Sequence, residues 1–297
     1  MENLIGYDRS TGELREDVEI YQKEKFERKV TEEVEKRYNE KAQKAQKQLE
    51  GYRQAKQIEK AIANGKGLEF IQCIQKPITE ILPELELSEC GYFMRLLSYM
   101  QRGKDGLLTH KTEPLTQSKI QEIFDLKNRQ TRKVLARLEE VGVIKSEMVK
   151  RSKVYFVNNF YHTMTSQKQR GRTSHFIKLM KGKLCELVKC LSTDALGLLY
   201  KIIPYFHYET FRLTDTPNES DLTKVKHLSH AKLAKLLGKK EVTIEKYMNE
   251  LSAKGVILST KSKNSINYYV HPDVLWSSKN PNTDSADSLR NMFNAHS

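Results

Sequence analysis

The chain lacks any long apolar run. Among its 297 residues, no stretch approaches the roughly 18 apolar residues that a membrane-spanning helix requires. The N-terminal residues contain no basic start followed by an apolar stretch, so no secretory signal is expected. These absences argue against a membrane protein and against a secreted one, and they favour a cytoplasmic location.

Cysteine is scarce and does not occur in metal-binding patterns. The chain has only Cys73, Cys90, Cys185 and Cys190. No CxxC pair is present, and no histidine stands at zinc-ligand spacing from a cysteine pair. We therefore expect reduced, partly buried thiols, with no zinc site and no disulfide framework.

Sequence motifs of catalytic and nucleotide-binding sites are also missing. The chain contains no GxxxxGK[ST], GxGxxG, HExxH or GxSxG pattern. The eight histidines are scattered, and the close pair His227 and His230 has no third ligand nearby. We predict that the protein is not an enzyme, with no catalytic residues, no cofactor and no metal.

What the chain does have is positive charge. Lys and Arg total 51 against 38 Asp and Glu, which gives a net charge of +13. Such a surplus favours an anionic partner, most simply nucleic acid.

A long charged segment precedes the rest of the chain. Residues 13–64 contain no proline and one glycine, and their larger side chains recur at a mean step close to 3.6 residues. This spacing predicts a helix. The helix is either solvated and held by short-range ion pairs, or it forms a homodimer or binds a protein partner, for example as a coiled coil. Its net charge near zero argues against direct DNA contact.

The strongest signal is an internal duplication. Residues 115–157 align without a gap on residues 228–270, at an offset of 113. Identical residues include the pairs Leu138/Leu251 and Gly142/Gly255. Two copies are too few for a solenoid, so the chain contains one supersecondary unit twice.

The order of signals within each copy is helix, polar turn, helix, glycine, strand, basic hairpin and strand. Together with the L..LE..GVI pattern at the end of the second helix, this order resembles the winged helix-turn-helix family over about residues 88–160 and 190–276. The resemblance implies a mainly α fold with small β-wings, in which a long N-terminal helix precedes two tandem winged helix-turn-helix domains. The predicted parts are a long charged helix (13–64), a connector (65–86), domain 1 (87–162), a basic linker (163–186), domain 2 (187–276) and a mobile polar tail (277–297).

In that family the second helix of each unit enters the DNA major groove, and the wing contacts the backbone. Arg and Gln pair with guanine and adenine, and lysines neutralise phosphates. The DNA-binding residues predicted in domain 1 and the linker are Arg129, Gln130, Arg132, Lys133, Arg137, Lys150, Arg151, Lys153, Arg170 and Arg172. Those predicted in domain 2 are Lys239, Lys240, Thr243, Lys246, Lys261 and Lys263. Carboxylates on the second helix of domain 2 predict that domain 1 supplies most of the affinity.

The predicted function is sequence-specific double-stranded DNA binding, most simply by a transcription regulator of a bacterial or phage-infected cell. Two adjacent domains resemble a covalently joined dimer that reads two half-sites about one helical turn apart. One alternative is a plasmid or phage replication initiator that binds repeated origin sites. Another is a DNA-tethered assembly factor that acts through the helix at 13–64.

Overall fold

The computed structural model describes residues 25–46, 49, 69–164, 175–262, 265–277 and 283–296. The described part of the chain combines helices with strands in small sheets, as the sequence predicts. Within these ranges, every helix is too short or too polar to span a lipid bilayer.

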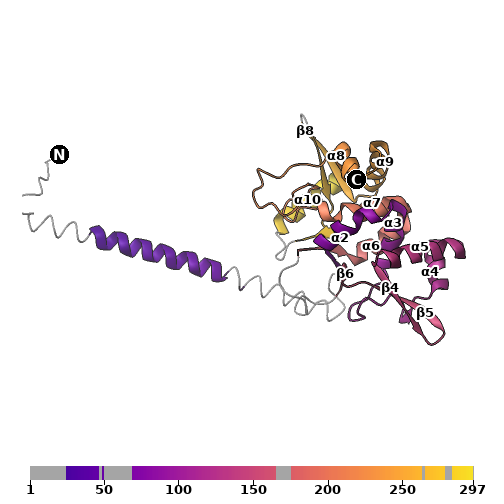
Figure 1. Cartoon of the computed structure of the whole chain (residues 1–297). Helices are drawn as coiled ribbons and strands as arrows, with labels where there is room; N and C mark the ends of the chain where they lie inside the picture. Colours follow the sequence, from indigo (N-terminus) through magenta and orange to yellow (C-terminus); the bar gives the residue numbers. More distant parts are fainter. Residues whose placement is uncertain are drawn as a thin grey trace, which may run out of the picture. The chain divides into compact units, whose positions relative to one another are not determined.

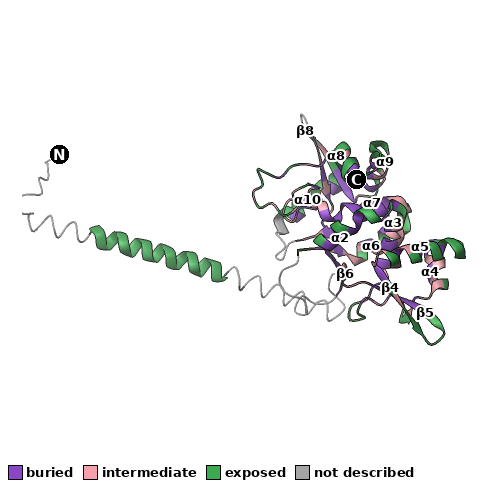
Figure 2. Ribbon diagram, in the orientation of Figure 1, coloured by how far each residue is buried: buried purple, intermediate pink, exposed green. Residues whose placement is uncertain are grey.

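The chain divides into two compact units, residues 1–67 and residues 68–297. In the first unit, residues 25–46 are helical, and every one of their side chains is exposed (Figure 2). This N-terminal helix is the main described part of the helix predicted over 13–64. Apart from residue 49, which is also helical, the remainder of that range lies outside the described residues.

The second unit contains two sets of elements that repeat one another (Figure 1). Copy 1 contains β1 (Phe70–Ile74), α2 (Gln75–Ile81), η1 (Leu82–Glu84), α3 (Leu87–Leu97), β2 (Thr109–His110), β3 (Glu113–Pro114), α4 (Gln117–Phe124), α5 (Asn128–Glu140), β4 (Ile144–Val149), β5 (Ser152–Val157) and β6 (His162–Thr163). Copy 2 contains β7 (Phe176–Met180), α6 (Lys181–Cys190), α7 (Thr193–Ile202), η3 (Ile203–Tyr205), α8 (His230–Leu237), α9 (Glu241–Ala253), β8 (Ile257–Ser262), β9 (Ser265–Val270) and β10 (Leu275–Trp276). A last helix, α10 (Thr283–Ala295), follows copy 2.

The duplicated segment builds the same helix pair in both copies. α4 and α8 end at Asp125 (φ 53°) and Gly238 (φ 61°), whose left-handed backbone turns the chain into α5 and α9. Gly, and to a lesser degree Asp, tolerate this conformation. After α5 and α9, Gly142 and Gly255 again take positive φ angles of 81° and 64°. The glycines that the sequence places after the second helices therefore end them in the left-handed conformation typical of helix C-termini.

An antiparallel hairpin follows each helix pair. The end pairs are Ile144–Val157 and Val149–Ser152 in copy 1, and Ile257–Val270 and Ser262–Ser265 in copy 2. Each residue of the second hairpin lies 113 positions after its counterpart in the first. The duplication thus extends to the strand register.

The predicted connector (65–86) and basic linker (163–186) are corrected by the structure. Their described residues form β1, α2, η1, β6, β7 and the start of α6, and the strands build one sheet with the order β10-β7-β1-β6. Ile177 and Leu179 of β7 are buried, so this strand has a core face. The linker prediction counted positive charges and overlooked the alternation of apolar residues in β7, which is typical of a half-buried strand.

The two copies are related by an approximate two-fold axis through this sheet. β1 and β7 pair antiparallel with Gln72 opposite Lys178. These two residues hold equivalent positions, because β1 to α3 repeats as β7 to α7 at an offset of 106. Because Gln72 and Lys178 are equivalent residues that lie directly opposite each other, the two-fold axis passes between them. β6 and β10 extend the sheet with equivalent pairings at its two edges.

Helices α3 and α7 cross in close contact on this axis. A Cβ atom at Gly91 would lie 1.8 Å from the backbone oxygen of Thr193, and one at Gly197 would lie 1.8 Å from that of Leu87. The two contacts are equivalent, since each glycine faces the first residue of the other helix. Only glycine lets the backbones approach this closely.

Two cations between the copies form equivalent hydrogen bonds, each from a side chain of one copy to a backbone oxygen of the other. Half-buried Arg95 donates from Nη1 to the backbone oxygen of Val188 (2.9 Å), and buried Lys201 donates from Nζ to that of Leu82 (2.6 Å). The donors and the acceptors are again equivalent residues of the two copies. The core is accordingly continuous between the copies, so the regions predicted as domains 1 and 2 belong to one compact unit.

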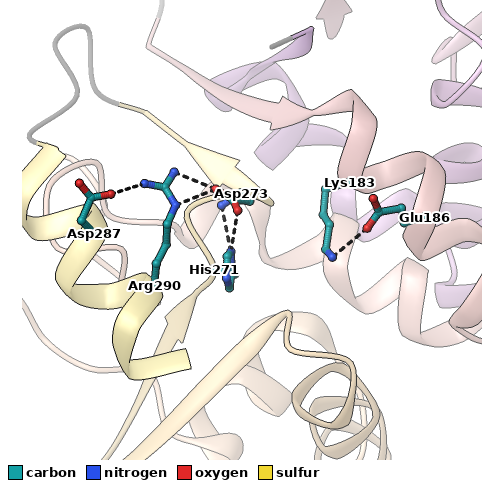
Figure 3. Close-up of polar contacts among 6 residues, drawn as sticks. All are labelled: Lys183, Glu186, His271, Asp273, Asp287 and Arg290. Carbon is teal, nitrogen blue, oxygen red and sulfur yellow. Dashed lines mark hydrogen bonds and ion pairs between the residues drawn. The ribbon is translucent and has the colours of Figure 1, made fainter. Parts of the chain in front are cut away.

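The predicted mobile tail (277–297) is wrong over residues 283–296, most of which form α10. Its Ala286, Leu289 and Phe293 are buried. Arg290 donates to Asp273 in the loop before β10 and to Asp287 of its own helix, each at 2.7 Å (Figure 3). Apolar residues at helical spacing and this paired arginine attach the helix to copy 2.

One position of the four-stranded sheet holds a buried histidine in copy 1 and a leucine in copy 2. His162 in β6 is fully buried, and its ring packs edge-on against Phe93. Neither of its ring nitrogens has a hydrogen-bond partner among the described residues. Burial lowers the pKa of His162 to about 3 from its ordinary 6.5. The equivalent position in copy 2 holds Leu275.

Replacing His162 by leucine, as in copy 2, is expected to make the fold more acid-resistant. The unfolded chain takes up a proton near pH 6.5, whereas folded His162 takes one up only near pH 3, so folding stability falls as pH falls through this window. At pH 5 the expected loss for the wild type is about 2 kcal/mol, which the variant does not show. Thermal unfolding at pH 7 and pH 5 measures the difference, and equal acid sensitivity in both proteins would refute it.

Candidate nucleic-acid interface

The packing of α5 fixes which of its side chains face solvent. Thr131, Leu135 and Leu138 are buried on one side of the helix. Arg129, Arg132 and Lys133 are exposed on the opposite side, three and four residues apart, and so share one face. We call these three cations the α5 basic face.

No described residue forms an ion pair or hydrogen bond with any cation of the α5 basic face. Their charges are therefore not neutralised within this part of the molecule. The face combines two planar guanidinium groups, each with several donors, and one flexible ammonium group. Such donors suit phosphate oxygens and the acceptor edge of guanine.

Two other predicted residues of α5 have intramolecular partners. Arg137 is half-buried, donates to the backbone oxygen of Glu84 (2.6 Å) and forms an ion pair with Glu140 (2.9 Å). Gln130 accepts a bond from the backbone N–H of Lys127 (3.4 Å), which caps the helix start. Arg137 thus stabilises the contact between α5 and the segment before α3, while Gln130 keeps its amide N–H groups available.

The hairpin of copy 1 carries two further exposed cations at its tip, Lys150 and Arg151. Lys150 has a φ angle of 57°, a conformation in which Gly or Asn is more usual. The third predicted residue, Lys153, lies 3.0 Å from Glu139 and 5.4 Å from the ring centre of Tyr155, so its charge is partly compensated. Of the three predicted residues in this hairpin, Lys150 and Arg151 therefore have exposed charges without a described partner, as the α5 basic face does.

In copy 2, the predicted residues likewise include one that has a partner within the protein and others that are exposed. Lys239 bonds to Glu86 at the start of α3, and this contact lowers the pKa of the Glu86 carboxyl. Lys240 is exposed, and Thr243 is half-buried. Lys246 is exposed and lies over the ring of Tyr247 at 5.1 Å. Lys239 therefore joins copy 2 to copy 1, which leaves Lys240 and Lys246 as the exposed cations around α9 among the predicted residues.

One of the α9 carboxylates that the sequence sets against phosphate approach, Glu250, has a structural role. Glu250 accepts from the backbone N–H (2.6 Å) and the Oγ (2.8 Å) of Ser192 at the start of α7. One turn earlier, Tyr247 donates to Asp194 (2.7 Å). These bonds hold α9 against the N-terminus of α7.

Four predicted residues cannot be placed in this interface. Lys261 lies in β8, but its side chain is not among those described. Arg170, Arg172 and Lys263 lie outside the described residues.

Sequence reasoning missed Asn128, the first residue of α5. It is exposed, and its Nδ2 donates to Gln121 of α4 (3.3 Å) beside the α5 basic face. Asparagine at the first turn of a groove-reading helix can pair with adenine. Its position directly after the turn that follows α4 could have identified it from the sequence.

Comparisons with protein-family models, with curated proteins and with solved structures give no match. The described residues also contain no group of three or more His, Cys, Asp or Glu side chains placed to hold a metal ion. We therefore infer a function from the geometry and charge of this chain alone.

Proposed function

We propose that the chain is a sequence-specific double-stranded DNA-binding protein built from two winged helix-turn-helix units. The observation that carries this proposal is the α5 basic face. Its cations stand on the second helix of the pair, the element that enters the major groove in such units, and they have no partner among the described residues. Arg137 and Lys153 nearby form ion pairs with described residues of the protein, whereas the three cations of the α5 basic face do not. These three cations are therefore free to bind an external anion such as DNA phosphate.

The hairpin tip of copy 1 supplies the backbone contact. Lys150 and Arg151 extend from the strand pair that follows α5, where a wing reaches phosphates. Holding a lysine at positive φ costs about 1 kcal/mol relative to glycine. A cation maintained at a strained tip position supports a role in binding rather than in packing.

The approximate two-fold axis favours one DNA site with two inverted halves. α5 and α9 are equivalent elements related by that axis, so they present their residues in opposite senses. Their exposed residues differ, with Arg129 and Arg132 on α5 against Val242 and Glu245 on α9. We therefore expect the half-sites to be inverted in position but unequal in sequence, with the tighter contact to the half read by α5.

A footprint of the purified full chain on the DNA that flanks its own gene tests this function. With competitor DNA at near-physiological salt, we expect protection that survives the competitor, with contacts in two successive major grooves. A single protected block over a promoter identifies a transcription regulator, whereas several evenly spaced blocks identify a replication initiator. Binding that vanishes as salt rises, without protection, would contradict base reading by α5 and favour the assembly factor.

A further inference from the structure

The N-terminal helix carries an apolar stripe that no other described residue of the first unit covers. The stripe consists of Phe26, Val30, Val34 and Tyr38, which are 69%, 45%, 59% and 74% exposed. Residues four apart lie about 40° apart around a helix, so the stripe follows one face. In proteins, most of the stability of a helix comes from packing of its apolar face rather than from intrinsic helix propensity. The stripe is thus a surface that gains from a partner.

The charges of the same helix indicate which partner fits. Residues 25–35 contain four carboxylates and three cations, whereas residues 36–46 contain one carboxylate and four cations. The sequence continues this asymmetry on both sides: 13–35 has nine acidic and five basic residues, and 36–60 has three and eight. The segment is acidic in its first half and basic in its second.

We propose that the N-terminal helix pairs antiparallel with the same helix of a second copy of this chain. Antiparallel pairing places the acidic half of each helix against the basic half of the other. Parallel pairing would place like charges together along the whole length, which is unfavourable. This proposal does not depend on DNA binding, because it involves the first unit alone.

The stripe also defines the register of the pair. With Val34 facing Val34 of the second copy, Val30 faces Tyr38 on either side of the centre. Glu27 and Lys41 lie seven residues, nearly two helical turns, from Val34, so both lie on its face. In this register Glu27 of each copy is opposite Lys41 of the other. The bond between Arg37 and Glu33 (3.2 Å) within the helix compensates a carboxylate near the centre.

The first experiment is sedimentation equilibrium of the full chain over a range of concentrations. We expect a dimer for the wild type, and at least a tenfold loss of association for Val34→Asp, because a charge then lies in the apolar centre. Asn39→Asp adds the same charge on the opposite side of the helix and is expected to leave the dimer intact. A wild-type monomer at all concentrations, or equal losses in both variants, would overturn the proposal.

Charge reversal then tests the orientation. Glu27→Lys and Lys41→Glu are each expected to weaken the dimer about tenfold, since each replaces two attractions by two repulsions. The double variant restores both attractions and is expected to dimerise like the wild type. In a parallel pair each residue faces itself, so either single reversal would leave association unchanged, and that result would refute the antiparallel arrangement.

Disulfide trapping tests the register independently. The partly exposed Cys185 and Cys190 are first replaced by serine, while Cys73 and Cys90 are buried and can stay. Under mild oxidation, Val34→Cys is expected to cross-link with itself, and Phe26→Cys only with Ala42→Cys. Self-linking of Phe26→Cys and of Ala42→Cys would indicate a parallel pair and overturn the proposal.

Discussion

Replacing Gly197 by alanine is expected to lower the unfolding temperature of the second unit by roughly 6–12 °C, which corresponds to a loss of about 3 kcal/mol. The new Cβ would lie 1.8 Å from the backbone oxygen of Leu87, and backbone atoms cannot move away as a flexible side chain can. Helices α3 and α7 would have to separate. Because the core is continuous between the copies, packing in both would be weakened together.

The two-fold relation supplies a second variant and a control. Gly91→Ala meets Thr193 at the same distance and is expected to cost a similar amount. Gly182→Ala, in α6, has no atom within 4 Å of the new Cβ and is expected to be neutral or to stabilise by about 0.5 kcal/mol. Calorimetry or circular dichroism of the three variants measures these effects. An unchanged transition for both Gly91→Ala and Gly197→Ala would mean that the helices do not cross so closely.

Removing the guanidinium groups of Arg129 and Arg132 together is expected to weaken DNA binding about 100-fold at near-physiological salt. Both side chains are exposed and unpaired among the described residues, so their removal affects binding to DNA without breaking interactions within the protein. The unfolding temperature should stay unchanged. A binding titration at several salt concentrations measures the affinity and its salt dependence, which becomes shallower for each phosphate that the protein no longer neutralises.

Matched single substitutions separate a specific interface from general positive charge. Lys189→Ala removes an exposed cation from α6 and is expected to change affinity less than twofold. Arg129→Ala is expected to weaken binding more than Lys246→Ala, because α9 carries the more acidic surface. Equal reductions in affinity from all three would show that binding follows net charge alone and would refute an interface centred on α5.

The functional consequence of the fold lies in how the copies are joined. Under the proposed function, a flexible linker would let α5 and α9 search for DNA independently. Here β1 and β7 lie side by side in one sheet, and the backbones of α3 and α7 approach each other closely at Gly91 and Gly197. The second unit therefore holds α5 and α9 at a fixed relative position. Under the proposed function, this makes the spacing between the two half-sites a strict requirement, and inserting a half-turn of DNA between them is expected to abolish binding by one of the two helices.

Several features followed from the sequence alone because their causes are local. The duplicated helix pair and hairpin depend on apolar periodicity, on glycines after the second helices and on residues within one short segment. The charge surplus and the exposed cations of α5 could likewise be predicted, since a helix with one apolar face must turn its other face to solvent. Residues 25–46 are helical for the same local reason.

Tertiary structure decided what depends on residues far apart in the chain. It turned part of the predicted linker into β7, because the backbone groups of that strand bond to β1 more than 100 residues earlier. It assigned Lys239, Arg137 and Glu250 to internal contacts, although their sequence surroundings match those of solvated residues. It also gave Gly91 and Gly197 their importance, since only the approach of a distant backbone makes an added Cβ impossible. The repeated unit and its positive charge follow from local sequence patterns, whereas the pairing of distant strands and helices determines which of those charges remain available to a partner.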